Sequence, residues 1–189
     1  DARLNNLTSL DLSNNTALFQ LYAHSNNLTS IDLGNNTALH ILSISSNNIT
    51  SLNVSFNLNL RHIYCTYNQL TSLDVSNNAS LRTLYCGGNQ LSVLDVSQNN
   101  YLEELVIYYS NFTSIDVSQN PILSILYCEN NQLTSLDLSN NPYLSRLRCN
   151  NNQLTSLDLS YCDSLTNLRC DSNQLTSLDL RNGNNINFY

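Results

Sequence analysis

The chain has 189 residues, of which 41% are hydrophobic, and its formal net charge at pH 7 is −7. This length and apolar content suffice for the core of one elongated domain. All seven basic residues are arginine, which argues against a broad phosphate-binding surface and therefore against a nucleic-acid partner. No apolar run approaches membrane-spanning length, so membrane insertion is not expected.

A repeat of 21 residues runs through the chain without insertion or deletion. Its copies are marked by one apolar anchor each: Leu7, Leu28, Ile49, Leu70, Leu91, Phe112, Leu133, Leu154 and Leu175. Such a period indicates one supersecondary unit stacked on copies of itself. We expect residues 1–189 to form a single solenoid of about nine coils, with function on a face rather than in a pocket. Because the array starts and stops inside a unit, with Ile186 still on a core position, we expect a fragment or mature part of a longer protein.

Each unit contains the pattern L-x-x-L-x-L-x-x-N twice, as residues 133–153 illustrate. The first half has Leu133, Leu136, Leu138 and Asn141, and the second half has Leu144, Leu147, Cys149 and Asn152. In each half, alternating inward and outward residues predict a short strand, followed by a turn at the asparagine. No segment keeps a helical period for ten residues. The fold class is therefore β, with short parallel strands on two faces of the solenoid and little or no helix.

The first half carries an outward aspartate in eight coils. These residues are Asp11, Asp32, Asp74, Asp95, Asp116, Asp137, Asp158 and Asp179. At strand spacing, neighbouring carboxylates repel by ~0.8 kcal/mol in water, and more at a lower effective dielectric. We expect hydroxyl and amide donors at the flanking Thr8-Ser9 and Ser13-Asn14 positions to offset this repulsion. Calcium bridging between coils is the alternative, although each coil offers one carboxylate and the ion takes six to eight oxygens. No other cofactor is expected.

The asparagine that ends each half predicts two ladders along the stacked coils. The first-half ladder runs Asn15, Asn36, Asn57, Asn78, Asn99, Asn120, Asn141 and then Cys162, and the second-half ladder runs Asn5, Asn26, Asn47, Asn68, Asn89, Ser110, Asn131, Asn152 and Asn173. An asparagine amide can bond neighbouring backbone groups at a tight turn. Ser110 and Cys162 are the exceptions in these rows.

Five of the six cysteines occupy one inward position of the second half. They are Cys65, Cys86, Cys128, Cys149 and Cys170, and they share this position with Ala23, Ile44 and Ile107. The position therefore requires a small or medium apolar group. We expect buried free thiols, because parallel in-register side chains hold Cβ atoms farther apart than the ~3.8 Å of a disulfide. Disulfides and a metal cluster remain alternatives, although no C-x-x-C spacing is present.

The outward positions of the second half vary from coil to coil and are rich in tyrosine and arginine. The candidate binding face consists of Tyr22, Tyr64, Tyr67, Tyr85, Tyr108, Tyr127, Arg146, Arg148 and Arg169. Tyrosine and arginine are the residues that recognition surfaces favour. The alternative is that β-propensity and stacking between strands alone select tyrosine here. Catalysis is not expected, because His24, His40 and His62 lie at three different repeat positions and share no geometry with a nucleophile.

The pattern resembles the leucine-rich repeat, which it matches throughout residues 7–180. It is most similar to the 21-residue bacterial subclass with consensus L-x-x-L-x-C-x-x-N-x-L-x-x-L-D-L, as in residues 81–91. This resemblance implies a secreted or surface protein of a bacterium, often one of the Bacteroidetes, that binds or adheres to a protein or glycan. Two alternatives stay open: a spacer or filament element that associates end to end, and binding of an ordered surface such as ice through the Thr/Ser/Asp face.

Overall fold

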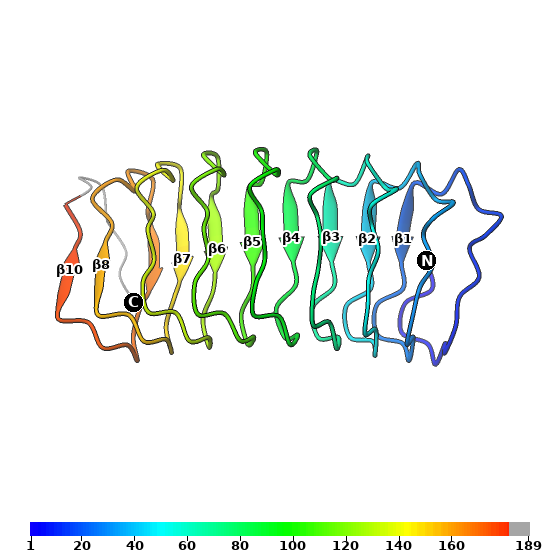
Figure 1. Ribbon diagram of the computed structural model, residues 1–189, viewed down its shortest axis with the longest axis horizontal. Helices are drawn as coiled ribbons and strands as arrows, with labels where there is room; N and C mark the ends of the chain where they lie inside the picture. The colour runs from blue at the N-terminus through cyan, green and yellow to red at the C-terminus, as the bar shows by residue number, and fades with distance from the viewer. Residues whose placement is uncertain (182–189) are drawn as a thin grey trace.

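The structure is a computed structural model, and it describes residues 1–181. The chain winds into a solenoid of stacked coils, with its first coil at one end and its last at the other (Figure 1). The described residues contain ten strands and no helix. They therefore include no helix that could cross a membrane. The prediction for Ile186 lies outside the described residues.

One face of the solenoid is an eight-stranded parallel sheet. Its strands are β1 (Gln20–Tyr22), β2 (Ile41–Ser43), β3 (His62–Tyr64), β4 (Thr83–Tyr85), β5 (Glu104–Val106), β6 (Ile125–Tyr127), β7 (Arg146–Arg148) and β9 (Asn167–Arg169). Each strand pairs in register with the residues 21 positions later, so that Tyr64 lies beside Tyr85. The predicted strands of the second half are therefore confirmed.

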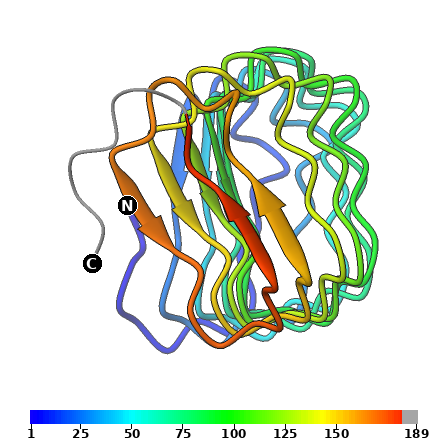
Figure 2. The same cartoon turned by 90° about the vertical axis from the view of Figure 1, so that its left-hand side faces the viewer.

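The opposite face also carries parallel strands, as predicted, but the first half of a coil forms a strand only near the C-terminal end. There β8 (Ser156–Asp158) and β10 (Ser177–Asp179) pair in parallel and face the larger sheet across the core (Figure 2). In the middle of the solenoid, shallow clefts of about 460 and 300 Å³ lie between neighbouring coils on this side. On this side, strand pairing among the described residues is limited to β8 and β10.

The core lies between the two faces and consists mainly of leucine from both halves of the unit. The anchors of the seven central coils, from Leu28 to Leu154, are fully buried. Leu7 and Leu175 at the ends are partly exposed and pack against this core. Burying one such side chain contributes roughly 1.5–3 kcal/mol. Each coil is thus stabilised chiefly by the coil before it and the coil after it.

Most asparagines of the two rows are buried, and their amides join neighbouring coils in different ways. In the second half, Asn47 Oδ1 accepts from Leu28 N at 3.0 Å, while Nδ2 donates to Ala23 O and Ile44 O at 3.0 Å each. In the first half, Asn57 Nδ2 donates to Leu33 O at 3.1 Å and to Asn36 O at 2.9 Å. Its Oδ1 is buried and accepts no hydrogen bond. The second-half amide is therefore the more completely satisfied.

The cysteine row faces inward, as the sequence predicts. Cys65, Cys86, Cys128 and Cys149 are fully buried free thiols, and Cys170 in the last described coil of the row is partly exposed. Burial raises the pKa of the Cys65 thiol to about 12. At this position cysteine acts as a small apolar side chain beneath the sheet.

Candidate functional site: the outward face of the sheet

The sheet face, by which we mean the outward side of the eight-stranded sheet, brings most of the predicted site residues into one row. Residues that pair in register along it are Tyr22, Ser43, Tyr64, Tyr85, Val106, Tyr127, Arg148 and Arg169. The tyrosines are half-buried, whereas Ser43 and Val106 between them are 7% and 2% exposed. Large rings therefore alternate with small covered residues, and part of each ring remains open to solvent.

At the centre of the sheet face, polar side chains interact across neighbouring strands. The Tyr64 and Tyr85 rings meet edge to face with centroids 5.1 Å apart, and the Tyr85 hydroxyl donates a hydrogen bond to the Glu104 carboxylate. Burial is the main cause that raises the pKa of Tyr85 above its usual range, and this hydrogen bond raises it further. The hydroxyl therefore stays protonated and holds the ring in a fixed position.

His62 lies beside the same tyrosines. Its Nδ1 is 3.1 Å from Thr83 Oγ1, and its ring lies parallel to that of Tyr64 with centroids 6.4 Å apart. Burial is the main cause that lowers the pKa of His62, so the ring is neutral at pH 7. Neither His24 nor His40 joins it, because His40 stacks on Phe19 at 4.0 Å and His24 lies beside Ser25.

The arginines gather toward the C-terminal end of the sheet face. The Arg148 guanidinium lies over the Tyr127 ring at 4.4 Å from its centroid, and its Nε is buried without a hydrogen-bond partner. Arg169 forms an ion pair with Asp171 at 3.6 Å, and Arg146 is exposed. The structure thus brings the three predicted arginines together, next to Tyr127, on β7 and β9.

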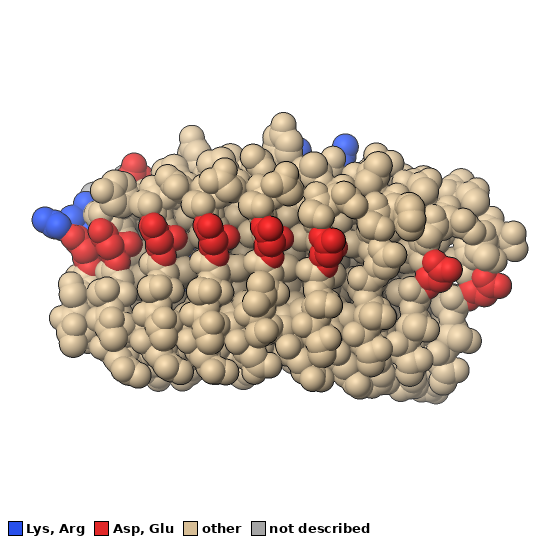
Figure 3. All heavy atoms as spheres, in the orientation of Figure 1, with Lys and Arg blue, Asp and Glu red and all other residues tan. Residues whose placement is uncertain are grey.

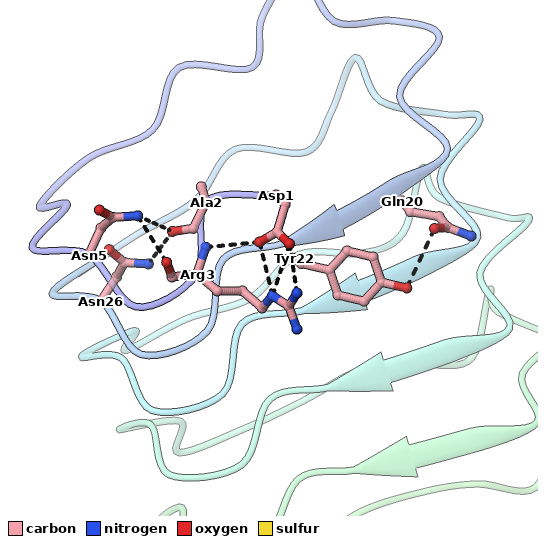
Figure 4. Close-up of polar contacts among 7 residues, drawn as sticks. All are labelled: Asp1, Ala2, Arg3, Asn5, Gln20, Tyr22 and Asn26. Carbon is pink, nitrogen blue, oxygen red and sulfur yellow. Dashed lines mark hydrogen bonds and ion pairs between the residues drawn. The ribbon is translucent and has the colours of Figure 1, made fainter.

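At the N-terminal end, Tyr22 is held by a different set of contacts (Figure 4). The Arg3 guanidinium lies 5.5 Å from the Tyr22 ring centroid and donates two-pronged hydrogen bonds to the Asp1 carboxylate. The Tyr22 hydroxyl donates to Gln20 Oε1 at 3.4 Å. Cation–π contact with arginine therefore occurs at both ends of the tyrosine row.

Tyr67 and Tyr108 do not lie on the sheet itself but at the turn just beyond β3 and β5. There they form a cluster with Tyr109, with ring centroids 5.9 Å apart for Tyr67 and Tyr108 and 5.7 Å apart for Tyr108 and Tyr109. The predicted site residues therefore fall into two neighbouring groups, the row on the strands and the cluster at the turn.

The aspartate face, formed by the outward aspartates of the first half, lies on the other side of the molecule. Its carboxylates form a line along the solenoid, interrupted where Asn53 replaces aspartate (Figure 3). Each Oδ1 accepts a hydrogen bond from the backbone two residues later, as from Ser97 N to Asp95 at 2.8 Å. The donors thus come from the position of Ser13 in the repeat.

Several contributors to the sheet face do not stand out in the sequence. Glu104 and Thr83 bind the central tyrosine and histidine, and Arg82 forms an ion pair with Glu103. Register alone could have found them, because each lies one coil away from its partner at the same or a nearby repeat position. The exposed rings of Tyr101 and Tyr143, on the turn before the strands, were also not among the predicted residues.

The described residues were found to hold no cluster of metal-binding side chains. Among residues 1–181, no three side chains of histidine, cysteine, aspartate or glutamate lie close enough to hold a metal ion. On the aspartate face, hydrogen bonds from Ser97 and Ser118 lower the pKa values of Asp95 and Asp116. The groups that the sheet face presents for contact with a ligand are tyrosine rings, guanidinium groups and hydroxyls.

No protein-family model and no curated protein sequence matches the chain. Solved structures do. The functional domain of InlJ from Listeria monocytogenes, which includes a cysteine ladder, has a TM-score of 0.73 and 35% identity over 93% of this chain and 46% of its own. A leucine-rich-repeat protein of Leptospira interrogans has a TM-score of 0.88 and 28% identity over 93% of this chain and 49% of its own.

YopM from Yersinia enterocolitica matches the whole chain with a TM-score of 0.81 and 23% identity, over 45% of its own length. The chain therefore spans about half the length of the structures that it matches. Its parallel solenoid without helix in residues 1–181 is the architecture of these neighbours. The chain has the leucine-rich-repeat fold of these bacterial proteins.

Proposed function

We propose that the sheet face is a non-catalytic recognition surface that binds a protein or glycan. The observation that carries this proposal is the single row of partly exposed Tyr22, Tyr64, Tyr85 and Tyr127 with Arg148 and Arg169. Half-buried rings held by neighbouring strands bring contact area at a low entropic cost, and arginine orients acidic or hydroxyl-rich groups. Surfaces of this composition supply most of the residues that dominate binding energy.

The resemblance to leucine-rich-repeat proteins supports the same conclusion, since it implies binding or adhesion. We further propose that the chain belongs to the 21-residue subclass and acts outside a bacterial cell, as a secreted or surface protein. The cysteine row and the L-D-L segments of the first half are the sequence features of that subclass. End-to-end self-association through the first and last coils is a separate proposal, which sedimentation of the protein at several concentrations would test.

The test is a binding screen against arrays of extracellular proteins and of glycans, followed by variants on both faces. Tyr64→Ala and Tyr127→Ala should each weaken binding of the selected ligand by about 1–3 kcal/mol, the range of interface hot spots. The matched controls are Asp95→Asn and Asp116→Asn on the aspartate face, which should leave the affinity unchanged. Circular dichroism of each variant verifies that the solenoid remains folded.

The opposite pattern would assign function to the other side. A ligand whose affinity follows Asp95 and Asp116 but ignores both tyrosines would contradict the proposal. In that case binding of an ordered surface such as ice becomes the leading function, and freezing hysteresis of the unmodified protein would measure it. A screen in which no ligand responds to either face would favour a spacer element.

A further inference from the structure

One corner of the solenoid departs from the repeat in three consecutive coils. The residue at this corner has a left-handed backbone in each coil, and most coils place serine, asparagine or glycine there: Ser25, Ser46, Gly88, Asn130, Asn151 and Ser172. The first coil has Leu4 at this position, with φ of 56°, and two coils have tyrosine, Tyr67 with φ of 53° and Tyr109 with φ of 46°. A bulky side chain in this region of φ is a strained outlier.

The next coil accommodates these rings with a pair of glycines. A Cβ atom on Gly88 would lie 2.6 Å from Cδ1 of Tyr67, and one on Gly87 would lie 2.8 Å from Cδ2 of Tyr108. Because both glycines lack a side chain, Tyr67 can reach across this coil to Tyr108 in the following one, with ring centroids 5.9 Å apart. The departures from the repeat in these three coils therefore act together to bring the Tyr67 and Tyr108 rings side by side.

This arrangement does not serve the fold. The turn forms equally well with serine or asparagine in other coils, and the Tyr67 and Tyr109 side chains remain 51% and 57% exposed. The coil that contains Tyr109 also has Ser110 in place of the asparagine of the second-half ladder, and the Ser110 hydroxyl donates to Tyr108 O at 3.3 Å. Backbone strain that the fold does not require is typical of functional sites.

The adjoining coil adds an incompletely satisfied carboxylate. Glu129 occupies the repeat position of Tyr108 one coil later, and Tyr109 N donates to its backbone oxygen at 3.1 Å. One side-chain oxygen of Glu129 is buried without a hydrogen-bond partner, and burial raises the pKa of this carboxyl. The charges of Arg148 and Arg169 act on this carboxyl and lower its pKa in part, but Arg148 lies over Tyr127 and Arg169 is paired with Asp171.

We propose that this aromatic corner, composed of Tyr67, Tyr108, Tyr109 and Glu129, binds a lysine or arginine side chain of a protein partner. The faces of tyrosine rings attract cations. The Tyr108 and Tyr109 rings meet edge to face at 81°, and the Tyr109 ring, whose residue is 57% exposed, is open to such a group. The Glu129 carboxylate supplies the opposite charge. This inference rests on the proposed function and names the partner chemistry at one edge of the sheet face.

The probes are the blocked tripeptides Gly-Lys-Gly, Gly-Arg-Gly and Gly-norleucine-Gly, titrated into the whole chain and followed by amide chemical shifts. The two cationic peptides should shift the Gly87, Gly88 and Tyr109 amides saturably. The norleucine peptide, which has the apolar stem without the charge, should bind at least about fivefold more weakly, a difference of about 1 kcal/mol. Maltotriose serves as a neutral, hydroxyl-rich probe.

The variants Tyr67→Asn and Tyr109→Asn separate a binding role from a structural one. Asparagine is the residue of other coils at this position, so each change should raise the melting temperature or leave it unchanged while it abolishes the shifts. Glu129→Gln should remove the preference for the cationic peptides over norleucine. Tyr143→Asn, which removes an equally exposed ring on another turn, should change neither binding nor the preference.

Three results would overturn the inference. Equal binding of norleucine and lysine peptides would show an apolar contact without cation recognition, and shifts with maltotriose alone would assign the corner to glycans. A lowered melting temperature of both asparagine variants, together with undiminished shifts, would make the tyrosines structural. Because Tyr64 and Tyr127 are unchanged in all these variants, failure at the corner leaves the test of the sheet face itself intact.

Discussion

The sheet face and the aspartate face repeat with the same period but satisfy their polar groups differently. On the aspartate face, each carboxylate bonds the backbone two residues later in its own coil, as Asp116 does with Ser118 N at 2.9 Å. At the centre of the sheet face, hydrogen bonds of the side chains join different coils, as between His62 and Thr83 or Tyr85 and Glu104. One face is a row of self-contained turns, and the other is a set of interactions between neighbours.

This difference indicates where sequence can change without loss of the fold. A self-contained turn needs the same acceptor in every coil, and Asn53 shows that a neutral one suffices, since its Oδ1 accepts from Ser55 N at 3.0 Å. The outward positions of the sheet have no such requirement, because the strand pairing beneath them uses the backbone alone. Variation can therefore accumulate on the sheet face and produce a particular binding surface.

The largest expected effect concerns the thiols beneath the sheet. In the native protein, Cys65, Cys86, Cys128 and Cys149 should react with a thiol reagent at least about two orders of magnitude more slowly than Cys170, because they become accessible only when coils separate. Reaction with Ellman's reagent, followed by mass spectrometry of labelled peptides, measures this. Fast labelling of a central cysteine would show that the coils separate readily on the sheet side. It would contradict the expectation that this face is rigid.

Two neighbouring residues of β3 test the contrast between the inward and outward sides of the sheet. Ile63 is fully buried, so Ile63→Ala should lower the free energy of unfolding by about 2–5 kcal/mol through lost burial and a cavity. Tyr64→Ala removes an edge-to-face contact but little core and should cost about 1 kcal/mol. Urea denaturation measures both. Equal losses would mean that the tyrosine row belongs to the fold and not to a binding surface.

The two rows of asparagine offer a comparison of the faces at the level of single amides. In Asn89→Ala, Leu70 N, Cys65 O and Cys86 O each lose the side-chain partner that they have in the native protein, and we expect a loss of about 3 kcal/mol. In Asn99→Ala, Val75 O and Asn78 O keep their backbone donors, Asn78 N and Leu81 N.

The change at Asn99 also removes a buried oxygen that has no partner, so its expected cost is about 1 kcal/mol. Urea denaturation of the two variants side by side gives the difference. If Asn99→Ala proves the more destabilising, the first-half row is the one that joins the coils, and the order proposed for the two faces is wrong. Asn89→Ser, which copies Ser110, should fall between the native protein and Asn89→Ala.

The 21-residue period made most of the fold predictable from the sequence. Register follows from the period, so the alignment of Tyr64 with Tyr85 and the inward direction of the cysteines could both be inferred from spacing. The extent of the strands in the first half could not be judged this way, because both halves of the unit carry the same pattern L-x-x-L-x-L-x-x-N. Among the described residues, the first half forms strands only at β8 and β10.

The site was predictable as a row of residue types but not as a set of contacts. Tyr67 and Tyr108 were predicted as members of the face, whereas Glu129 was not. Their relation depends on a left-handed turn and on two glycines in the intervening coil. Side-chain direction at such a turn comes from backbone conformation, which the spacing of residues does not determine.

The smallest expected effect is the pH dependence of the aspartate face, where repulsion competes with hydrogen bonding. Hydrogen bonds from Ser97 and Ser118 lower the pKa values of Asp95 and Asp116, while repulsion from neighbouring aspartates contributes less. The side-chain hydrogen bond of Ser76 is the main cause that lowers the pKa of Asp74. The folded state therefore binds fewer protons than an unfolded chain with aspartate pKa values near ~3.9.

The sign of the effect follows directly. The stability contributed by these carboxylates is present above about pH 4 and is lost as the pH falls through the lowered folded-state pKa values, so the melting temperature should drop in that range. The triple variant Asp74→Asn, Asp95→Asn, Asp116→Asn should flatten the slope, since asparagine keeps the turn as Asn53 does. A melting temperature that instead rises on acidification would show that repulsion prevails. Calcium distinguishes the remaining alternative, because stabilisation by millimolar calcium that the triple variant lacks would make the aspartate face an ion-binding surface and no longer a row of independent turns.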